Sequence, residues 1–393
     1  MSGPERRSVA ALAAIYATRM LGLFLPLPVL ALYAHGLPDY SPELLGLAMG
    51  AYGLTQAVMQ IPFGSLSDRI GRKPLITLGL GLFALGSLVG AMAHSVAVLA
   101  VARAIQGSGA VSAAVTALLA DLTRPEVRTR AMAVIGISIG LSFVVALVIA
   151  PVLDAAFGVP GIFVMMLFLA LAGVAVLHLA VPAEPPRSGG ADSRSFADLL
   201  AIVRRRDLRP VYFGIFALHF IMTATFMSVP QALQGDLGIP SAEHWKVYLG
   251  VFVVSILGTV PLVMRTDRGA DAGPLFVWSI LCLALAQALL GADHVHLWRV
   301  LAFLTLFFAV FNYLEARLPA LLTNAAGPSE RGAALGVFAT AQFLGAFGGG
   351  AVGGILLGKF GISGVFWGSA VMAVFWAAAA GRSIPQAPRK TAK

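Results

Sequence analysis

The sequence has little cysteine and little charge. Cys282 is the only cysteine, so no disulfide can form within the chain and no pair of cysteines can hold a metal ion. Charged residues make up 11% of the chain, against about 25% in an average soluble domain. Hydrophobic residues make up 59%, and the mean hydropathy is +0.88. A soluble protein of 393 residues cannot bury that much apolar surface, so the composition predicts an integral membrane protein.

Twelve apolar runs predict twelve membrane-spanning helices. Each run is long enough to cross a hydrocarbon layer of about 30 Å at about 1.5 Å per residue. A membrane β-barrel would instead show short segments of alternating hydrophobicity. The expected fold class is therefore an all-α membrane protein, with helices at 9–34, 43–66, 73–93, 96–120, 131–153, 160–181, 210–234, 246–264, 273–291, 296–322, 332–357 and 362–381.

The few charges are distributed unevenly between these runs. Twenty-one of the 27 lysines and arginines fall in the two tails and in every second loop, beginning with Arg6 and Arg7. Because cytoplasmic loops carry an excess of lysine and arginine, both termini are expected on the cytoplasmic side. The net charge of +9 follows from this topology, so the lipid bilayer, and not nucleic acid, is the expected partner.

The longest interruption, residues 182–209, divides the runs into six and six. It predicts an N-terminal bundle at 1–181, a cytoplasmic linker at 182–209, a C-terminal bundle at 210–381 and a tail at 382–393. The later part of the linker, "SFADLLAIVRRRDLR", puts apolar residues on one helical face beside three arginines, which fits a helix lying in the membrane interface. A plain tether is the alternative interpretation of this segment.

The two halves repeat the same loop chemistry. "SDRIGRKP" follows the second run, and "RTDRGADAGP" follows the eighth, which places Asp267 and Arg268 where the first half has Asp68 and Arg69. "PEVRTRAMAVIG" after the fourth run corresponds to "PSERGAALGVF" after the tenth. Parallel six-helix repeats joined by a central linker are typical of transporters that carry their substrate between two halves.

Two motifs carry a resemblance to a known family. "GSLSDRIGRKP" (64–74) resembles the signature loop between helices 2 and 3 of the major facilitator superfamily, and "RAIQGSGA" (103–110) resembles its helix-4 signature. The resemblance covers essentially the whole chain and is to the drug:proton antiporter-like branch. It implies two pseudo-symmetric six-helix bundles, a small lipophilic substrate, a proton gradient and no cofactor as the source of energy, a monomer, and a place in the bacterial inner membrane.

The loop at 64–74 is expected to act as a conformational latch. In the family, the acid of this loop caps the start of helix 11, here near Gly332, and closes the inner side of the molecule. Arg72 is expected to pair with Asp121 at the end of helix 4. A turn that only fixes the topology is the alternative. The predicted latch residues are Gly64, Asp68, Arg69, Gly71, Arg72 and Asp121.

Ionisable residues inside membrane spans are costly and therefore point to function. Glu315 is the one acid well inside a predicted span and is the first candidate proton carrier; a fixed pair with an arginine is the alternative. His219 is the second candidate, although a lone histidine on an apolar helix can be purely structural. Arg103 resembles the family's helix-4 arginine; it cannot release a proton, so it would act on a neighbour or form a structural pair.

Arg19 departs from the pattern of exporters of lipophilic cations, which commonly carry an acid in helix 1. A cation there favours neutral or anionic cargo, unless Arg19 simply pairs with Glu315. Apolar, aromatic and amide side chains are expected to complete the cavity wall and suit hydrophobic substrates. The predicted substrate cavity comprises Arg19, Met20, Phe24, Tyr52, Gln56, Gln60, Phe143, Met222, Phe226, Phe308, Asn312 and Gln342.

Two further patterns bear on packing and mechanism. The glycine-rich run 345–354 predicts a tight helix contact, expected with the second helix. "GISIGLSFVVALVIAPVLDA" keeps a glycine-rich start but lacks the glycines that follow the proline of the family's antiporter helix 5, which weakens the antiport prediction.

The predicted function is proton-coupled efflux of small amphipathic compounds by alternating access. A facilitator or importer of a metabolite such as a sugar or organic acid is the first alternative, and a non-transporting sensor or scaffold is the second. No phosphate-binding loop, zinc-protease motif or nucleophile elbow occurs, so no catalytic or metal-binding residues are predicted and the chain is not expected to be an enzyme.

Overall fold

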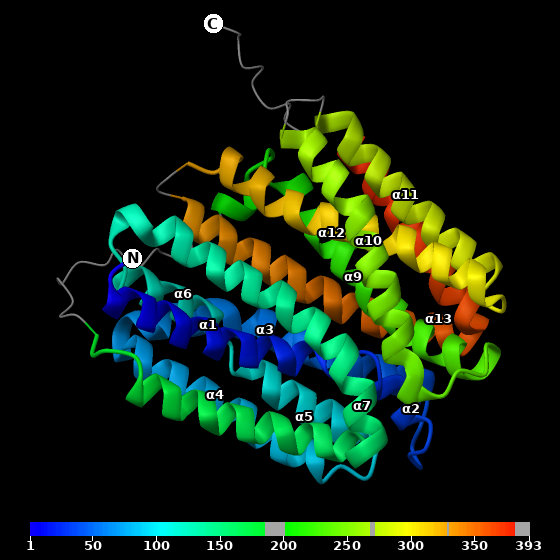
Figure 1. Ribbon diagram of the computed structural model, residues 1–393, viewed down its shortest axis with the longest axis horizontal. Helices are drawn as coiled ribbons and strands as arrows, with labels where there is room; N and C mark the ends of the chain where they lie inside the picture. The colour runs from blue at the N-terminus through cyan, green and yellow to red at the C-terminus, as the bar shows by residue number, and fades with distance from the viewer. Residues whose placement is uncertain (185–200, 268–271, 328–329, 382–393) are drawn as a thin grey trace, which may run out of the picture. The chain divides into compact units, whose positions relative to one another are not determined.

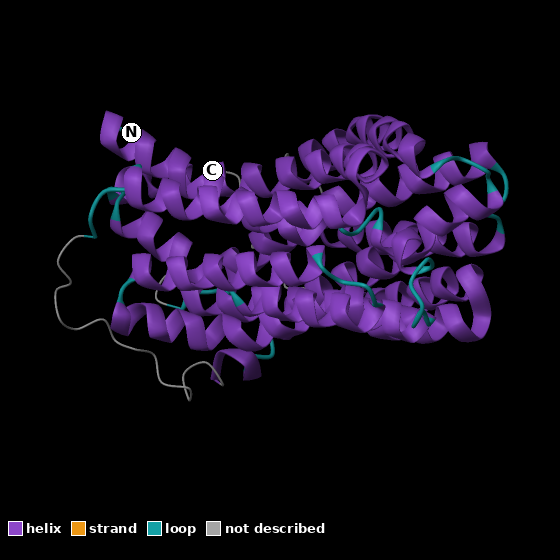
Figure 2. Cartoon of the chain, turned by 90° about the horizontal axis from the view of Figure 1, so that it is seen from below, coloured by secondary structure: helices purple, strands orange, loops and turns teal. Residues whose placement is uncertain are grey.

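The computed structural model describes residues 1–184, 201–267, 272–327 and 330–381, and within these ranges it contains helices and no strand (Figure 1, Figure 2). Of the predicted linker helix at 195–209, residues 195–200 lie outside these ranges and residues 201–204 are helical, while the predicted tail lies wholly outside the described ranges. The elements are α1 (Gly3–Phe24), α2 (Leu30–Ala34), α3 (Pro42–Ile70), α4 (Arg72–Ala91), α5 (Val96–Ser108), α6 (Ser112–Asp121), α7 (Pro125–Leu179), α9 (Arg209–Gln231), a π-helical turn (Ala232–Asp236), a 3₁₀ turn (Ser241–Glu243), α10 (His244–Asp267), α11 (Ala272–Ala292), α12 (Leu297–Ala325) and α13 (Arg331–Gly381).

Ten stretches of helix in the described part of the chain are long and apolar enough to cross a membrane. Two of them, α7 with 55 residues and α13 with 51, are far longer than the roughly 20 residues that one crossing needs. Each is broken by a glycine with positive φ, Gly158 at 67° and Gly361 at 65°, a backbone conformation that other residues rarely adopt. A break in each of these two helices accounts for twelve crossings.

The chain divides into two compact units. The first comprises Met1–Ser193 with Ser241–Trp245, and the second comprises Arg194–Pro240 with Lys246–Lys393. In the first unit α3 packs on α5, α4 packs on both α5 and α7, and α1 packs on α7. In the second unit α13 packs on α9 and α11, and α11 packs on α12.

Apolar side chains also cover the outside of the helices. Leu257 of α10 is 73% exposed, and Phe157 and Ile137 of α7 are each 70% exposed. Helices that are apolar on every side are typical of membrane spans, because lipid replaces water around them.

The glycine-rich run at 345–354 packs on α9. A Cβ added to Gly345 would lie 2.2 Å from the carbonyl oxygen of Phe216, and one added to Gly349 would lie 2.1 Å from that of Phe220. The two helices are therefore in backbone contact at these points. The sequence expectation named the second helix as the partner; within this unit the partner is α9.

Candidate transport site

The turn between α3 and α4 is a single residue. Gly71 ends α3 and precedes the first residue of α4, and its φ of 112° lies in the region that favours glycine. Its N–H donates to the backbone oxygen of Ser67 at 3.2 Å. The signature loop predicted from the sequence is thus a sharp reversal that depends on Gly71. Gly64, by contrast, is not tightly packed, since a Cβ there would lie 3.9 Å from its nearest neighbour.

Charged side chains of this loop meet on Arg72. Its guanidinium forms an ion pair with Asp68, donates to Oγ of Ser67 at 2.5 Å, and places Nε 3.6 Å from Oδ2 of Asp121. The predicted pairing of Arg72 with Asp121 is therefore confirmed, whereas Arg69 is exposed. The loop belongs to the first unit and the helix that begins near Gly332 belongs to the second, so the expected closure of one on the other stays a prediction, and with it the latch role.

Glu184 belongs to this site, and the sequence reasoning missed it. Its carboxylate accepts the backbone N–H of Arg72 at 3.1 Å and that of Lys73 at 2.5 Å, while Nζ of Lys73 donates to the backbone oxygen of Val181 at 2.7 Å. The first N–H groups of a helix need acceptors, and Gly71 has no side chain to offer one. The missing cap was the only sequence signal, and it did not indicate an acid more than 100 residues away.

Arg19 occupies the interior of the first unit. It lies in α1 and is 1% exposed. Its guanidinium donates to the backbone oxygen of Gln106 at 3.0 Å and to Oε1 of Gln56 at 2.7 Å. Its Cζ lies 4.9 Å from the ring centroid of Phe83 and 5.5 Å from that of Tyr52. All of these partners are neutral. The pairing of Arg19 with Glu315 would join the two units and stays a prediction.

Arg103 lies in α5 beside the same tyrosine and is also 1% exposed. It donates to the backbone oxygens of Gly22 at 2.6 Å and Leu23 at 3.5 Å, and to Oε1 of Gln106 at 3.0 Å. Its Cζ lies 4.8 Å from the ring centroid of Tyr52. The two predicted arginines therefore form one cluster, which we call the arginine cluster: Arg19, Arg103, Tyr52, Gln56 and Gln106.

A second polar cluster lies inside the second unit. His219 of α9 is 3% exposed, and its Nδ1 lies 3.3 Å from the backbone oxygen of Ile215 and 3.9 Å from Oε2 of Glu315 on α12. Its Nε2 lies 2.7 Å from the side-chain nitrogen of Gln342 on α13. Because Nδ1 faces oxygens and Nε2 faces an N–H donor, neutral His219 carries its proton on Nδ1. We call His219, Glu315 and Gln342 the carboxyl cluster.

Glu315 is not tied to an arginine inside its own unit. Among the described residues of that unit, His219 is the one basic side chain within ion-pair distance of its carboxylate. Its buried Oε2 has no hydrogen-bond partner. This removes the fixed glutamate–arginine pair as an interpretation within the second unit.

The other predicted cavity residues are divided between the units. Phe24 and Phe143 pack edge to face with centroids 5.1 Å apart in the first unit, and Phe226 and Phe308 lie 6.2 Å apart in the second. Asn312 donates to Ser255 at 3.5 Å. Met20, Gln60 and Met222 are buried. A substrate cavity lined by residues of both bundles would lie between the two units, so this cavity stays a prediction.

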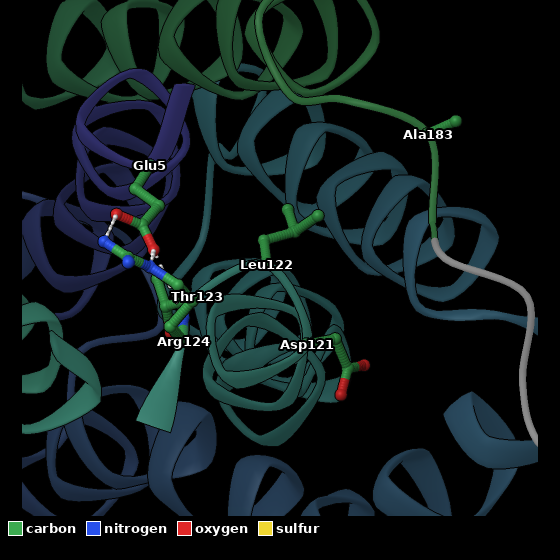
Figure 3. Close-up of a pocket in the computed structure, with 6 residues that line it drawn as sticks. All are labelled: Glu5, Asp121, Leu122, Thr123, Arg124 and Ala183. Atoms are coloured by element: carbon green, nitrogen blue, oxygen red, sulfur yellow. Dashed lines mark hydrogen bonds and ion pairs between the residues drawn. The ribbon is translucent and has the colours of Figure 1, made fainter. Parts of the chain in front are cut away.

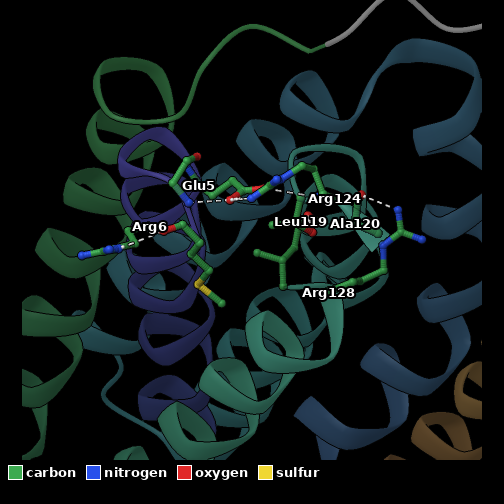
Figure 4. A network of polar contacts seen from close by, with 9 residues as sticks. Glu5, Arg6, Leu119, Ala120, Arg124 and Arg128 are labelled. Atoms are coloured by element: carbon green, nitrogen blue, oxygen red, sulfur yellow. Dashed lines mark hydrogen bonds and ion pairs between the residues drawn. The ribbon is translucent and has the colours of Figure 1, made fainter. Parts of the chain in front are cut away.

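A hollow of about 360 Å³ lies at the end of the first unit (Figure 3). Its walls include an ion pair in which Nε of Arg124 lies 2.9 Å from Oε1 of Glu5. The carboxylate of Asp121 also lines the hollow and points away from this pair. Figure 4 shows the same ion pair joining the start of α1 to the turn before α7, next to Arg128, which donates to the backbone oxygen of Ala120 at 3.0 Å. The hollow contains no member of the arginine cluster, and its contacts fasten the helix ends together.

Comparison with known proteins identifies the family. The sequence model of the Major Facilitator Superfamily matches residues 8–271 and 211–393. The inner membrane transport protein YajR of Escherichia coli K12 is 41% identical over 380 residues, covering 96% of this chain and 83% of that protein. Multidrug resistance protein 2 of Bacillus subtilis 168 is 27% identical over 351 residues, covering 86% of this chain and 85% of that protein.

A solved structure shares the fold. The crystal structure of a bacterial homolog of the human lysosomal transporter Spinster, in an inward-facing and occupied conformation, superposes with a TM-score of 0.81 at 15% identity. The superposition covers 99% of this chain and 100% of that one. With its two apolar helical units and its signature loop, the chain belongs to the Major Facilitator Superfamily and is a membrane transport protein and not an enzyme.

Proposed function

We propose that this protein exports small amphipathic compounds across a bacterial inner membrane in exchange for protons, by alternating access. The carboxyl cluster is the observation that carries the proposal. Glu315 lies more than two turns from either end of α12 and beside His219, so two groups that can bind a proton stand together inside a membrane span. A transporter that moves substrate without ion coupling has no need of such a pair.

The geometry supports a proton carrier more than a structural contact. At 3.9 Å, His219 is close enough to Glu315 to feel its charge but is not hydrogen-bonded to it. The histidine is instead held by the carbonyl of Ile215 and by Gln342, which leaves the Glu315 carboxylate free to change partners. A carboxyl group that changes its exposure to water during the transport cycle can take up a proton on one side of the membrane and release it on the other.

One known relative supports export of drug-like compounds. A multidrug resistance protein aligns with 86% of the chain, and the relative from Escherichia coli supports transport at the inner membrane without indicating its direction. The contacts of Arg72 with Asp68 and Asp121 would then belong to the latch, which closes the inner side of the molecule during one part of the transport cycle and opens during the other. The energy would come from the proton gradient without a cofactor.

Proton movement in proteoliposomes tests the proposal. Liposomes that contain a pH-sensitive dye are given a pH gradient and then a panel of lipophilic anions, neutral compounds and cations. We expect at least one member of the panel to drive proton movement through the wild type and to drive at least tenfold less through Glu315→Gln. The matched control is Glu43→Gln, because Glu43 is exposed in the first turn of α3.

One result would contradict proton-coupled export, and a second would contradict the role given to Glu315. Substrate flux without any proton signal would favour the facilitator, and proton movement that survives in Glu315→Gln would remove Glu315 as the carrier.

A further inference from the structure

The first unit holds two positive charges that none of its described acids balances. Arg19 and Arg103 are each 1% exposed, and their Cζ atoms lie 5.5 Å and 4.8 Å from the ring centroid of Tyr52. Arginine stays protonated in proteins, so neither group can lose its charge to suit an apolar setting. The cluster therefore keeps both charges inside a membrane-spanning bundle.

The hydrogen bonds of the two guanidinium groups all go to neutral oxygens. Arg19 uses an amide and a carbonyl oxygen, and Arg103 uses two carbonyl oxygens and an amide oxygen. These bonds satisfy individual N–H groups, but they do not offset the charge. Buried charges are normally paired, because an uncompensated one is strongly unfavourable.

The described acids of this unit are engaged elsewhere. Glu5 is paired with Arg124, Asp68 is paired with Arg72, and Asp39 accepts backbone N–H groups at the start of α5. The remaining described acids of the unit stand at helix ends, at the Gly158 break or in loops. None is among the partners of the arginine cluster.

Three donors of the cluster have no acceptor in the structure. They are Nε of Arg19, Nε of Arg103 and the hydroxyl of Tyr52, and all three are fully buried. Each can donate a hydrogen bond, and two belong to positive groups. An anionic oxygen group has both the hydrogen-bonding capacity and the charge that these donors lack.

The cluster is held firmly in place. A Cβ on Gly107 would lie 2.2 Å from the backbone oxygen of Tyr52, so α3 and α5 are in backbone contact at the tyrosine. A Cβ on Gly22 would lie 2.1 Å from the ring of Phe83, which stacks on Arg19. Donors that are fixed in advance lose little entropy when they bind a ligand.

We propose that Arg19, Arg103 and Tyr52 bind the anionic group of the transported compound, a carboxylate or sulfonate attached to an apolar body. The inference rests on the proposed export function. It narrows the substrate class from amphipathic compounds in general to amphipathic anions.

Binding of a matched pair of probes tests the inference. 2-Naphthoate and 2-naphthamide share the same ring system and differ in charge, and the affinity of each for the full chain in detergent is measured from ligand-dependent thermal stabilisation. We expect the wild type to bind the naphthoate at least tenfold more tightly, since hydrogen bonds to charged groups change affinity by about ten- to a hundredfold.

Variants of the cluster should change that preference. Arg19→Gln should bring the ratio of the two affinities to about one, and Tyr52→Phe, which keeps the ring, should lower the ratio by about three- to tenfold. The matched control is Arg128→Gln, because Arg128 is an exposed arginine outside the cluster, and it should keep the wild-type ratio. If Arg19→Gln does not fold, Tyr52→Phe alone decides the question.

Three results would overturn the inference. They are equal affinity of the wild type for the two probes, an unchanged ratio in the folded cluster variants, and stabilisation by chloride equal to that by naphthoate, which would make the cluster a site for an inorganic counter-ion. The assay uses no pH gradient, so a failure of proton coupling leaves its result unaffected.

Discussion

The two units are built alike around their polar clusters, but the clusters have opposite chemistry. In the first unit, Tyr52 of the arginine cluster is the residue whose backbone Gly107 contacts. In the second, His219 of the carboxyl cluster precedes Phe220, whose backbone Gly349 contacts. Both clusters are thus anchored where two helices touch through a glycine.

What differs is whether the charge can change. The arginine cluster has a fixed positive charge and neutral partners, whereas the carboxyl cluster has two groups that gain and lose protons. A repeated scaffold can therefore separate two tasks, with substrate selection in one half and proton coupling in the other. The following variants test that separation.

The largest expected effect comes from filling the glycine contacts. Gly107→Ala and Gly349→Ala each put a Cβ within 2.2 Å of a carbonyl oxygen, so the helices must move apart, at a cost of about 2–3 kcal/mol. Thermal unfolding in detergent measures the loss, which should be similar in the two units. Gly250→Ala in α10 is the control, because nothing lies within 4 Å of its added Cβ, and helix propensity should make it neutral or slightly stabilising. Equal stability of all three variants would contradict the backbone contacts.

A smaller and more selective effect is expected from the two amides. Gln56→Leu removes an acceptor from Arg19, and Gln342→Leu removes the partner of Nε2 on His219. We expect Gln56→Leu to lower the naphthoate-to-naphthamide affinity ratio about tenfold while leaving proton movement unchanged. Gln342→Leu should instead lower proton movement and leave the affinity ratio unchanged. Ligand binding and dye-reported proton movement, measured on both variants, check this. If either variant changed both properties equally, the tasks would not be separate.

The smallest expected effect is on the pH dependence of stability. One loop aspartate in each unit, outside the membrane spans, should contribute stability that is lost in acid. His296 and then Arg299 hold the pKa of Asp293 down to about 2, and the backbone N–H groups of Ala97 and Val96 hold the pKa of Asp39 below its usual range. A lowered pKa in the folded state gives stability that is present above the unfolded pKa, about 3.9, and is lost as the pH falls through the folded value.

Asp293→Asn and Asp39→Asn should therefore be less stable than the wild type at pH 6. For Asp293→Asn, the difference should disappear as the pH approaches about 2. Unfolding temperatures measured across this pH range provide the check. A difference that stays constant with pH would contradict the role of these carboxylates.

Much of the fold and part of the site followed from the sequence. Apolar runs predicted an all-helical membrane protein, and the resemblance of the loop at 64–74 to the family's signature led to the expected pairing of Arg72 with Asp121. Intramembrane charge singled out Arg19, Arg103, His219 and Glu315, because such residues are rare at that depth. These are signals that a single segment carries by itself.

The rest depends on which segments meet in space. Glu184 caps a helix more than 100 residues away, and the contact of Gln342 with His219 was not foreseen. The glycine run at 345–354 signalled a close contact, which was expected with the second helix, whereas within its own unit the run contacts α9. A polar side chain has no periodicity that reveals its partner, so tertiary packing decides these contacts.

The central claim is that one unit selects the anion and the other moves the proton. The most direct test adds 2-naphthoate to dye-loaded proteoliposomes that contain wild type or Glu315→Gln, with the naphthoate-to-naphthamide affinity ratio measured on the same preparations. The account predicts that Glu315→Gln keeps the wild-type ratio but loses the proton movement that naphthoate drives in the wild type. Proton movement that persists in Glu315→Gln, or an affinity ratio that falls together with it, would contradict the account.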